Sequence, residues 1–295
     1  MLPLYKEEGQ PPRGIMAGRF TRTDNDPGSN VRVLERESQS AATKVERERD
    51  FHNKVYTEST RRRIWGFYDT NSASHDHFQK LVRGSNGLKG ARVLEIGAGL
   101  TTQAFWMVEE GAHVTGIDIS DVVVEKVRVR ARELGLQDRC DFQVMDAENL
   151  SFAPESFDVV CGNSVIHHID LELAYANAAK VLKLQGRAVW REPLGHNPLL
   201  NAFRRLTPRM RTEDEHPLVM DDLKLADRWF SSVDARFFHL TTPAAIAFRN
   251  SSRFLQVLRR LERIDARLLP AQGGGLNRFA WFVVVQMVKP GSETT

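Results

Sequence analysis

Residues 91–102 read ARVLEIGAGLTT, and this stretch decides the fold. It opens with short apolar residues, which are typical of a strand buried in a parallel sheet. Gly97 and Gly99 then break the strand, and residues 101–110 carry apolar side chains at helical spacing. The stretch therefore predicts a strand, a tight glycine turn and a helix whose first N–H groups face a polar or anionic part of a ligand.

The residues that follow the turn show whether the site is of the dinucleotide type or of another nucleotide-binding type. A dinucleotide fingerprint, G-x-G-x-x-G, needs a glycine where this chain has Thr102. The next two strand-like runs each end in an acid, Asp118 and Asp146. Asp118 lies about 20 residues past the turn, where doubly wound folds place a carboxylate on ribose hydroxyls. A fourth apolar run at 156–163 completes an alternation of strands and helices that predicts a parallel sheet covered on both faces.

Together these motifs carry a resemblance to a known family. Glu95 stands two residues before the G-x-G, and acid-x-G-x-G resembles the first motif of the class I S-adenosylmethionine (SAM) methyltransferases. Thr101 stands where that family has a third glycine. The resemblance covers four motifs in order, over residues 90–193. It implies a doubly wound, Rossmann-like α/β sheet of seven strands, with residues 279–288 as an antiparallel last strand.

The resemblance also implies a cofactor and the residues that hold it. The cofactor is SAM, with S-adenosylhomocysteine as its product. The acid after the third strand is expected to bind the adenine amino group, and the next backbone N–H a ring nitrogen. The expected cofactor-binding residues are Glu95, Gly97, Ala98, Gly99, Asp118, Ile119, Asp146, Ala147 and Asn163.

The sequence is less informative about the residues that act on the methyl acceptor. His167, His168 and Asp170 follow the fourth strand and are candidate catalytic residues, because a histidine can act as a base near neutral pH. The alternative is that the histidine pair only shapes the pocket. Glu192 and His196 are second-rank base candidates. We expect no metal site, because the cluster of these histidines and Glu192 lacks a tight ligand spacing.

The chain is expected to have three parts. Residues 1–50 form an N-terminal arm and helix, residues 51–90 form lid or entry helices, and residues 91–295 form the SAM-binding core. Residues 192–218 interrupt the alternation after the fifth strand, and a long insert at that position is expected to cap the substrate pocket. The expected pocket residues are Tyr56, Tyr68, His196 and Phe203.

Composition limits the classes of partner. The 295 residues include 41 basic and 38 acidic residues, and this near balance argues against a nucleic-acid partner. The start of the chain has no apolar signal core, and the longest apolar run is too short to span a bilayer. We therefore expect a cytoplasmic protein with no membrane partner. Residues 1–30 carry many Pro, Gly, Arg and Asp residues with a few apolar ones, and they form either a disordered leader or an arm that packs on a neighbouring subunit. The second alternative predicts a homo-oligomer in which subunits exchange the arm.

The acceptor is predicted only as a class. The insert and the aromatic segment before the core resemble a bacterial subgroup of small-molecule methyltransferases, in which some enzymes methylate a prenyl side chain and start a cyclisation. This resemblance implies C-methylation of a prenyl or terpenoid group in secondary metabolism. O- or N-methylation of a small metabolite and non-catalytic SAM binding by a regulator are the alternatives.

Overall fold

The computed structural model describes residues 44–53, 72–207, 215–270 and 274–291. The chain divides into two units, Met1–Ala42 and Thr43–Thr295, and all the described residues belong to the second. The expected N-terminal arm over residues 1–30 therefore lies outside the described residues, as do Tyr56 and Tyr68.

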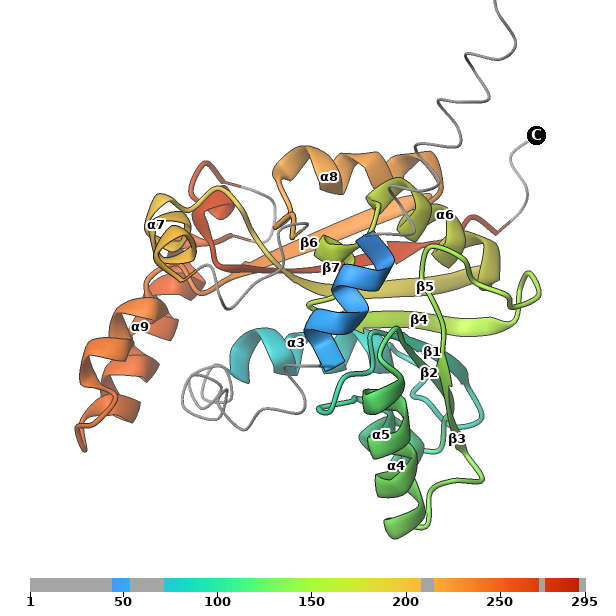
Figure 1. Cartoon of the computed structure of the whole chain (residues 1–295). Helices are drawn as coiled ribbons and strands as arrows, with labels where there is room; N and C mark the ends of the chain where they lie inside the picture. Colours follow the sequence, from blue (N-terminus) through green and yellow to red (C-terminus); the bar gives the residue numbers. More distant parts are fainter. Residues whose placement is uncertain (1–43, 54–71, 208–214, 271–273, 292–295) are drawn as a thin grey trace, which may run out of the picture. The chain divides into compact units, whose positions relative to one another are not determined.

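A seven-stranded sheet forms the centre of the second unit, in the order β3-β2-β1-β4-β5-β7-β6 (Figure 1). The first five strands are parallel, and β7 runs antiparallel to both of its neighbours. The strands are β1 (Arg92–Ile96), β2 (His113–Asp118), β3 (Cys140–Val144), β4 (Phe157–Asn163), β5 (Leu182–Pro193), β6 (Ser232–Phe238) and β7 (Phe282–Val288). This order confirms the doubly wound, methyltransferase-type sheet that the sequence predicted.

Helices cover both faces of the sheet. The described helices are residues 44–53, α3 (Ser72–Arg83), α4 (Ala104–Glu109), α5 (Asp121–Glu133), α6 (Leu171–Val181), α7 (Pro198–Leu206), α8 (Met220–Leu225) and α9 (Phe254–Leu268). Short 3-10 helices lie at η2 (Ile166–His168), η4 (Ala226–Arg228), η5 (Thr242–Phe248) and η6 (Asn277–Phe279).

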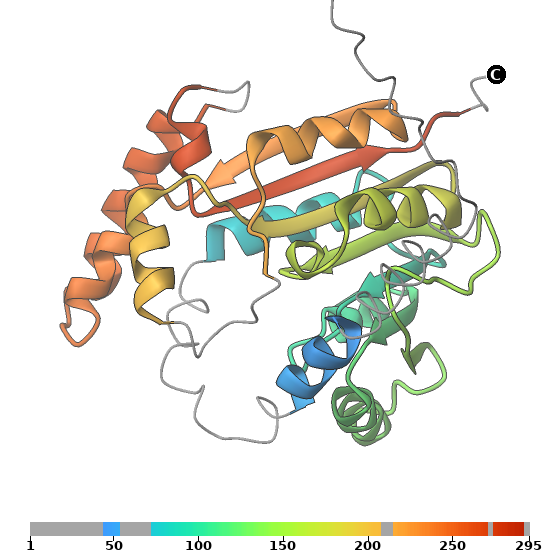
Figure 2. The same ribbon diagram turned by 45° about the horizontal axis from the view of Figure 1, so that its top comes forward.

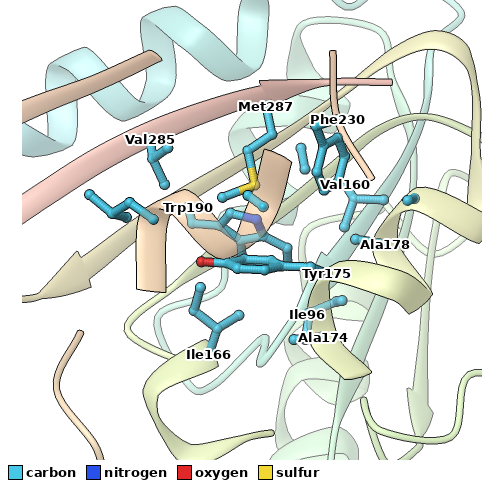
Figure 3. Packing of buried hydrophobic residues seen from close by; sticks show 14 of the residues in the cluster. Ile96, Val160, Ile166, Ala174, Tyr175, Ala178, Trp190, Phe230, Val285 and Met287 are labelled. Carbon is cyan, nitrogen blue, oxygen red and sulfur yellow. The ribbon is translucent and has the colours of Figure 1, made fainter. Parts of the chain in front are cut away.

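The core has two layers because successive strand residues point to opposite faces. In β1, Val93 packs with α3, α4 and α5, whereas Leu94 packs with α6 and α8. In the second layer Tyr175 of α6, Trp190 of β5 and Met287 of β7 meet, all fully buried (Figure 3). The packing of such large side chains fixes the fifth strand and, with it, the residues that follow its carboxyl end.

Several element boundaries differ from the expected ones. Apolar residues at helical spacing over 171–184 predict a helix to residue 184, but α6 ends at Val181, because Leu182 already pairs with Phe157 of β4. Residues 244–269 are likewise predicted to be largely helical, and the structure divides them into η5 and α9. The cap contains α7, which Asn197 begins by accepting hydrogen bonds from the N–H groups of Leu199 and Leu200.

Two features place the site. The strand order reverses between β1 and β4, and ligands of open α/β sheets bind at such a switch point, outside the carboxyl ends of the strands. The two ends of the cap also meet there, since Leu194 and Leu218 form a β-bridge. The insert therefore leaves the sheet and returns to it at the same point.

Candidate functional site

The glycine turn after β1 has the backbone that only glycine adopts easily. Gly97 and Gly99 have φ angles of 69° and 57°. A side chain on Gly97 would also approach Val165 to 2.5 Å. The turn is anchored by the N–H of Ala98, which donates to the carbonyl of Ile117 at 2.9 Å. Both glycines are therefore needed to bring the main chain close to the crevice.

Glu95 holds this turn against the start of α4. Its carboxylate accepts hydrogen bonds from the Thr102 hydroxyl and from the N–H groups of Gln103 (2.6 Å) and Ala104 (3.2 Å). Burial raises the pKa of Glu95 to about 7, against the effect of these hydrogen bonds. The carboxylate thus caps the helix and shapes the turn, which is a positioning role that the motif alone does not reveal.

The two acids at the strand ends lie beside the turn. Asp118 accepts hydrogen bonds from the N–H groups of Gly99 and Ser120, both at 2.9 Å. Asp146 accepts from the N–H of Glu148 at 2.9 Å and from the Asn149 amide at 2.8 Å. Each carboxylate has about four lone-pair positions, so each keeps acceptor capacity for a ligand hydroxyl or amine.

A single cavity of about 580 Å³ opens over these groups. Its volume falls within the roughly 300–1,000 Å³ typical of small-molecule sites. All nine expected cofactor residues line it: Glu95, Gly97, Ala98, Gly99, Asp118, Ile119, Asp146, Ala147 and Asn163. This lining suits an adenosyl group. The carboxylates can accept from hydroxyl groups, Ile119 and Ala147 are apolar, and the glycine turn leaves room for close approach.

His167, which also lines the cavity, lies between two carboxylates. Nδ1 of His167 lies 2.6 Å from Oε2 of Glu192, and Nε2 lies 3.3 Å from Oε1 of Glu215. Glu192 is fully buried, and its other oxygen accepts hydrogen bonds from the N–H groups of Val165 (2.9 Å) and Ile166 (3.2 Å). Four contacts therefore fix the orientation of the imidazole and its partners.

The carboxylates control the charge of His167. Burial alone lowers its pKa, but hydrogen bonds and charges from Glu192 and Glu215 outweigh burial and raise the pKa to about 9. The neighbouring His168 behaves in the opposite way. Its own burial and the charge of His167 lower its pKa. One histidine of the pair therefore carries a proton at neutral pH, and the other is neutral.

Two sets of side chains are spaced closely enough to surround a metal ion. They are Glu48, His52 and His168, and His167, His168 and Glu215, with candidate ligand atoms within 4.8 Å of one another in each set. In the second set, His167 already meets a carboxylate at each ring nitrogen.

Some predicted residues lie elsewhere. Asp170 caps α6 by accepting from the N–H of Leu173, and His196 accepts from the N–H of Met220 at 3.1 Å. Neither is among the described residues that line the cavity, so Asp170 is a helix cap and the expected pocket role of His196 is not met. Of the expected pocket residues, Phe203 does line the cavity, and Tyr56 and Tyr68 fall outside the described residues.

Sequence reasoning missed several lining residues. Glu215 has no local signal, because it follows the cap and reaches His167 only through the fold. Three further aromatic side chains line the cavity, Phe51, Trp281 and Phe282. The guanidinium of buried Arg191 lies 4.0 Å from the Phe282 ring centre and donates to Asn163 at 2.9 Å. The start of β7 thus supplies aromatic side chains to the cavity, and no sequence motif predicts them.

The helix at residues 44–53 covers the cofactor end of the cavity. Arg49 donates to the carbonyl of Ile119 at 3.2 Å, and Asn53 donates to Asp121 at 3.0 Å. Lys44 lies 3.5 Å from Glu148. The helix is therefore fastened to the loops after β2 and β3, which also carry the two strand-end acids. This helix spans residue 50, where the arm was expected to give way to the lid.

Comparison with known proteins gives a consistent result. A model of the methyltransferase domain family matches residues 94–190. The chain is 37% identical over 100 residues to methyltransferase GfsG of Streptomyces halstedii, which covers 33% of this chain and 36% of that protein. It is 34% identical over 149 residues to aklanonic acid methyltransferase DauC of Streptomyces sp. (strain C5), covering 46% of this chain and 67% of that protein.

A solved structure shares the fold. A phosphoethanolamine N-methyltransferase of Haemonchus contortus superimposes with a TM-score of 0.59 at 19% identity, over 82% of this chain and 60% of that one. The matches span from about a third to two thirds of the lengths of these proteins. With the glycine turn, the two strand-end acids and the antiparallel β7, they show that the chain belongs to the class I SAM-dependent methyltransferases.

Proposed function

We propose that this protein transfers a methyl group from SAM to a small, largely apolar metabolite, and that the acceptor is a carbon of a prenyl side chain. One observation supports the proposal: the same cavity is lined by the cofactor residues and by His167 and four aromatic side chains. Donor and acceptor would therefore share one enclosed space, as direct transfer requires.

The cofactor end has a residue for each part of SAM. Asp118 would accept from the ribose hydroxyls and Asp146 from the adenine amino group. The glycine turn would let the main chain approach the rest of the molecule. When bound, SAM supplies a methyl group on a positively charged sulfur, which is already activated for attack. The protein's remaining task is to align the acceptor and exclude water.

The aromatic wall favours a carbon acceptor. When a prenyl double bond attacks the methyl carbon, its π electrons form the new carbon–carbon bond and a carbocation remains on the substrate. Aromatic faces stabilise such a cation, and Phe51, Phe203, Trp281 and Phe282 line the same cavity. Loss of a proton from a neighbouring carbon then restores a double bond.

In its deprotonated form, His167 would take that proton. Glu192 fixes Nδ1 as the hydrogen-bonded nitrogen, so Nε2 is the atom that receives the proton from the substrate. Glu215 occupies the space beside Nε2, and its side chain is only 15% exposed. An acceptor that approaches Nε2 must therefore displace the Glu215 carboxylate, which can afterwards carry the proton from His167 toward solvent.

Methylation of a hydroxyl group is the second candidate. A buried carboxylate–histidine pair is the usual device for removing a proton from a hydroxyl nucleophile. In that case Nε2 would take the proton of the acceptor oxygen, and the aromatic wall would only hold an apolar ring. The two candidates use the same residues and differ in the atom that gains the methyl group.

The experiment uses SAM labelled with carbon-13 in the methyl group. The full chain is incubated with a prenylated indole, with the same indole carrying a saturated side chain, and with a phenol panel. We expect a labelled C-methyl signal from the prenylated indole alone. A labelled O-methyl signal from the phenols would establish the second candidate, and SAM binding without turnover of any acceptor would contradict both.

A further inference from the structure

Helix α7 presents an apolar ridge to solvent. Leu199 and Leu206 are 80% and 82% exposed, and Phe203 is 44% exposed. Their spacing of four and three residues places them on one side of the helix. No residue of α7 is buried. A helix that forms part of a cap therefore leaves its most apolar residues on the surface, where exposed apolar groups of this size mark interaction sites.

The segment around α9 carries further exposed apolar side chains and, in addition, a cluster of arginines. Leu255 and Ile264 of α9, and Ile246 and Phe248 before it, are all more than 40% exposed. Residues 242–279 contain seven arginines and only two acidic residues, although the whole chain has a net charge of only +3. Four of these arginines lie exposed on α9, at positions 259, 260, 263 and 267.

Both groups lie at the same end of the described unit, beyond β5, β7 and β6 (Figures 1 and 2). We propose that this end, named here the α7–α9 surface (residues 198–206, 242–270 and 274–279), docks on the anionic surface of a phospholipid bilayer. Anionic headgroups attract clustered arginines, and apolar side chains exposed beside them gain burial at the membrane interface. No helix in the described part of the chain has the length and apolar content needed to cross the bilayer.

Two other occupants fit the surface less well. A second copy that pairs α9 with α9 about a two-fold axis would bring the arginines of the two helices together, and like charges repel. A nucleic acid would satisfy the arginines but would gain nothing from Leu199 and Leu206. A bilayer with anionic headgroups matches both components. This proposal departs from the expectation of no membrane partner, which rested on the lack of a signal core and of a spanning segment.

The docking surface and the cavity share one helix. Leu200, Phe203 and Arg204 of α7 line the cavity, while Leu199 and Leu206 of the same helix face outward. An apolar acceptor dissolved in the bilayer could therefore reach the cavity beside α7 without crossing water. This consequence rests on the proposed function, whereas the docking itself does not.

The test measures binding of the full chain to vesicles by flotation. Vesicles of phosphatidylcholine alone are compared with vesicles that also contain phosphatidylglycerol. We expect binding only to the anionic vesicles, weakened by high salt. The double variant Arg259→Gln/Arg263→Gln should weaken binding by about tenfold or more, because each arginine near the surface contributes roughly fivefold. The variant Leu199→Ser/Leu206→Ser should weaken it by about tenfold or more through lost apolar burial.

Matched controls are Leu173→Ser on α6 and Arg130→Gln on α5, both at exposed positions away from this surface. Thermal melting confirms that each variant is folded. Binding that is equal on neutral and anionic vesicles, or absent from both, would overturn the proposal. So would a dimer in sedimentation equilibrium that Leu199→Ser/Leu206→Ser dissociates, because a second copy would then cover the surface. Turnover of a water-soluble acceptor is measured separately, so failure of docking and failure of methyl transfer are distinguishable.

Discussion

Glu192 contacts three neighbours through its two carboxylate oxygens, the N–H groups of Val165 and Ile166 and the Nδ1 of His167. In the variant Glu192→Gln the amide oxygen can keep the two backbone hydrogen bonds. The amide NH₂ then faces Nδ1, which must become an acceptor, so the proton moves to Nε2. His167 can no longer receive a proton at the nitrogen that faces the cavity.

We therefore expect Glu192→Gln to lower kcat by about 10²–10⁴-fold, with little change in the Kd for S-adenosylhomocysteine. Steady-state kinetics and calorimetry measure the two quantities. Glu125→Gln, at an exposed position on α5, is the control. An unchanged kcat would show that His167 is not the base.

Glu215 sets the pH at which His167 becomes available. A base acts when deprotonated, so kcat/KM of the free enzyme should rise with pH through the His167 pKa of about 9. The variant Glu215→Gln removes one of the two charges that raise this pKa, with Glu192 and His168 still facing the ring. The rising limb of the kcat/KM profile should therefore move to lower pH. A limb that stays in place would mean that another group is being titrated.

The raised pKa of His167 also determines how the free energy of unfolding depends on pH. The pKa of folded His167 lies above its ordinary value of 6.5. Its ion pairs therefore stabilise the fold fully below pH 6.5, and this contribution disappears as the pH rises through about 9. Denaturant unfolding of the wild type across this range should show the loss, and Glu215→Gln should show less of it.

The sequence predicts residues of this site only where a strand end places them. Asp118 and Asp146 are predictable because parallel strands end at the same edge of the sheet, so an acid after each run must lie near the glycine turn. Glu215 is not predictable, because its contact with His167 depends on how the cap returns to the sheet. The structure shows Asp170 as the cap of α6, a role that the sequence does not distinguish from a catalytic one.

At the scale of elements, the helix at residues 44–53 is fastened by polar contacts to the loops that hold the cofactor residues. Arg49 and Asn53 contact the loop after β2, and Lys44 contacts Glu148 after β3. A ligand that orders the loops after β2 and β3 should therefore also order the helix at residues 44–53.

We expect S-adenosylhomocysteine to slow amide hydrogen exchange over residues 44–53. Arg49→Ala should reduce this protection and weaken ligand binding by up to about tenfold, since a hydrogen bond from a charged donor contributes roughly 1.5–3 kcal/mol and only part of it is coupled to the ligand. Glu46→Ala, at an exposed position of the same helix, should change neither. Equal exchange rates with and without ligand would contradict the coupling.

Element types were more predictable than element boundaries. The period of apolar residues gave each strand of the sheet, because burial of one or both faces determines that period. The end of α6 was misplaced because apolar residues continue from the helix into β5 without a break. The start of α7 could have been predicted from Asn197-Pro198, a capping residue followed by a proline suited to the first turn.

At the scale of the whole molecule, a ligand that binds only the folded state raises the free energy of unfolding. S-adenosylhomocysteine at 100 times its Kd should add about 2.7 kcal/mol and raise Tm by about 5 °C or more. At the same concentration, Asp118→Ala should show a smaller increase, because it loses acceptor positions for the ligand and the bond to Gly99. Asp141→Ala on the exposed side of β3 is the control.

Calorimetric scanning measures these shifts. NAD, which needs the third glycine that this chain lacks, should leave Tm unchanged. A shift with NAD and none with S-adenosylhomocysteine would contradict the cofactor assignment and, with it, the role of the two strand-end acids.

The position of β7 constrains the order in which the chain can fold. β7 lies between β5 and β6, and among the described strands β6 pairs with β7 alone. During synthesis on the ribosome, β6 is therefore made before its partner. The backbone groups of β6 can pair only after residues 282–288 have emerged. Until then β5 presents an unpaired edge, and an unpaired edge favours hydrogen bonding with strands of other chains.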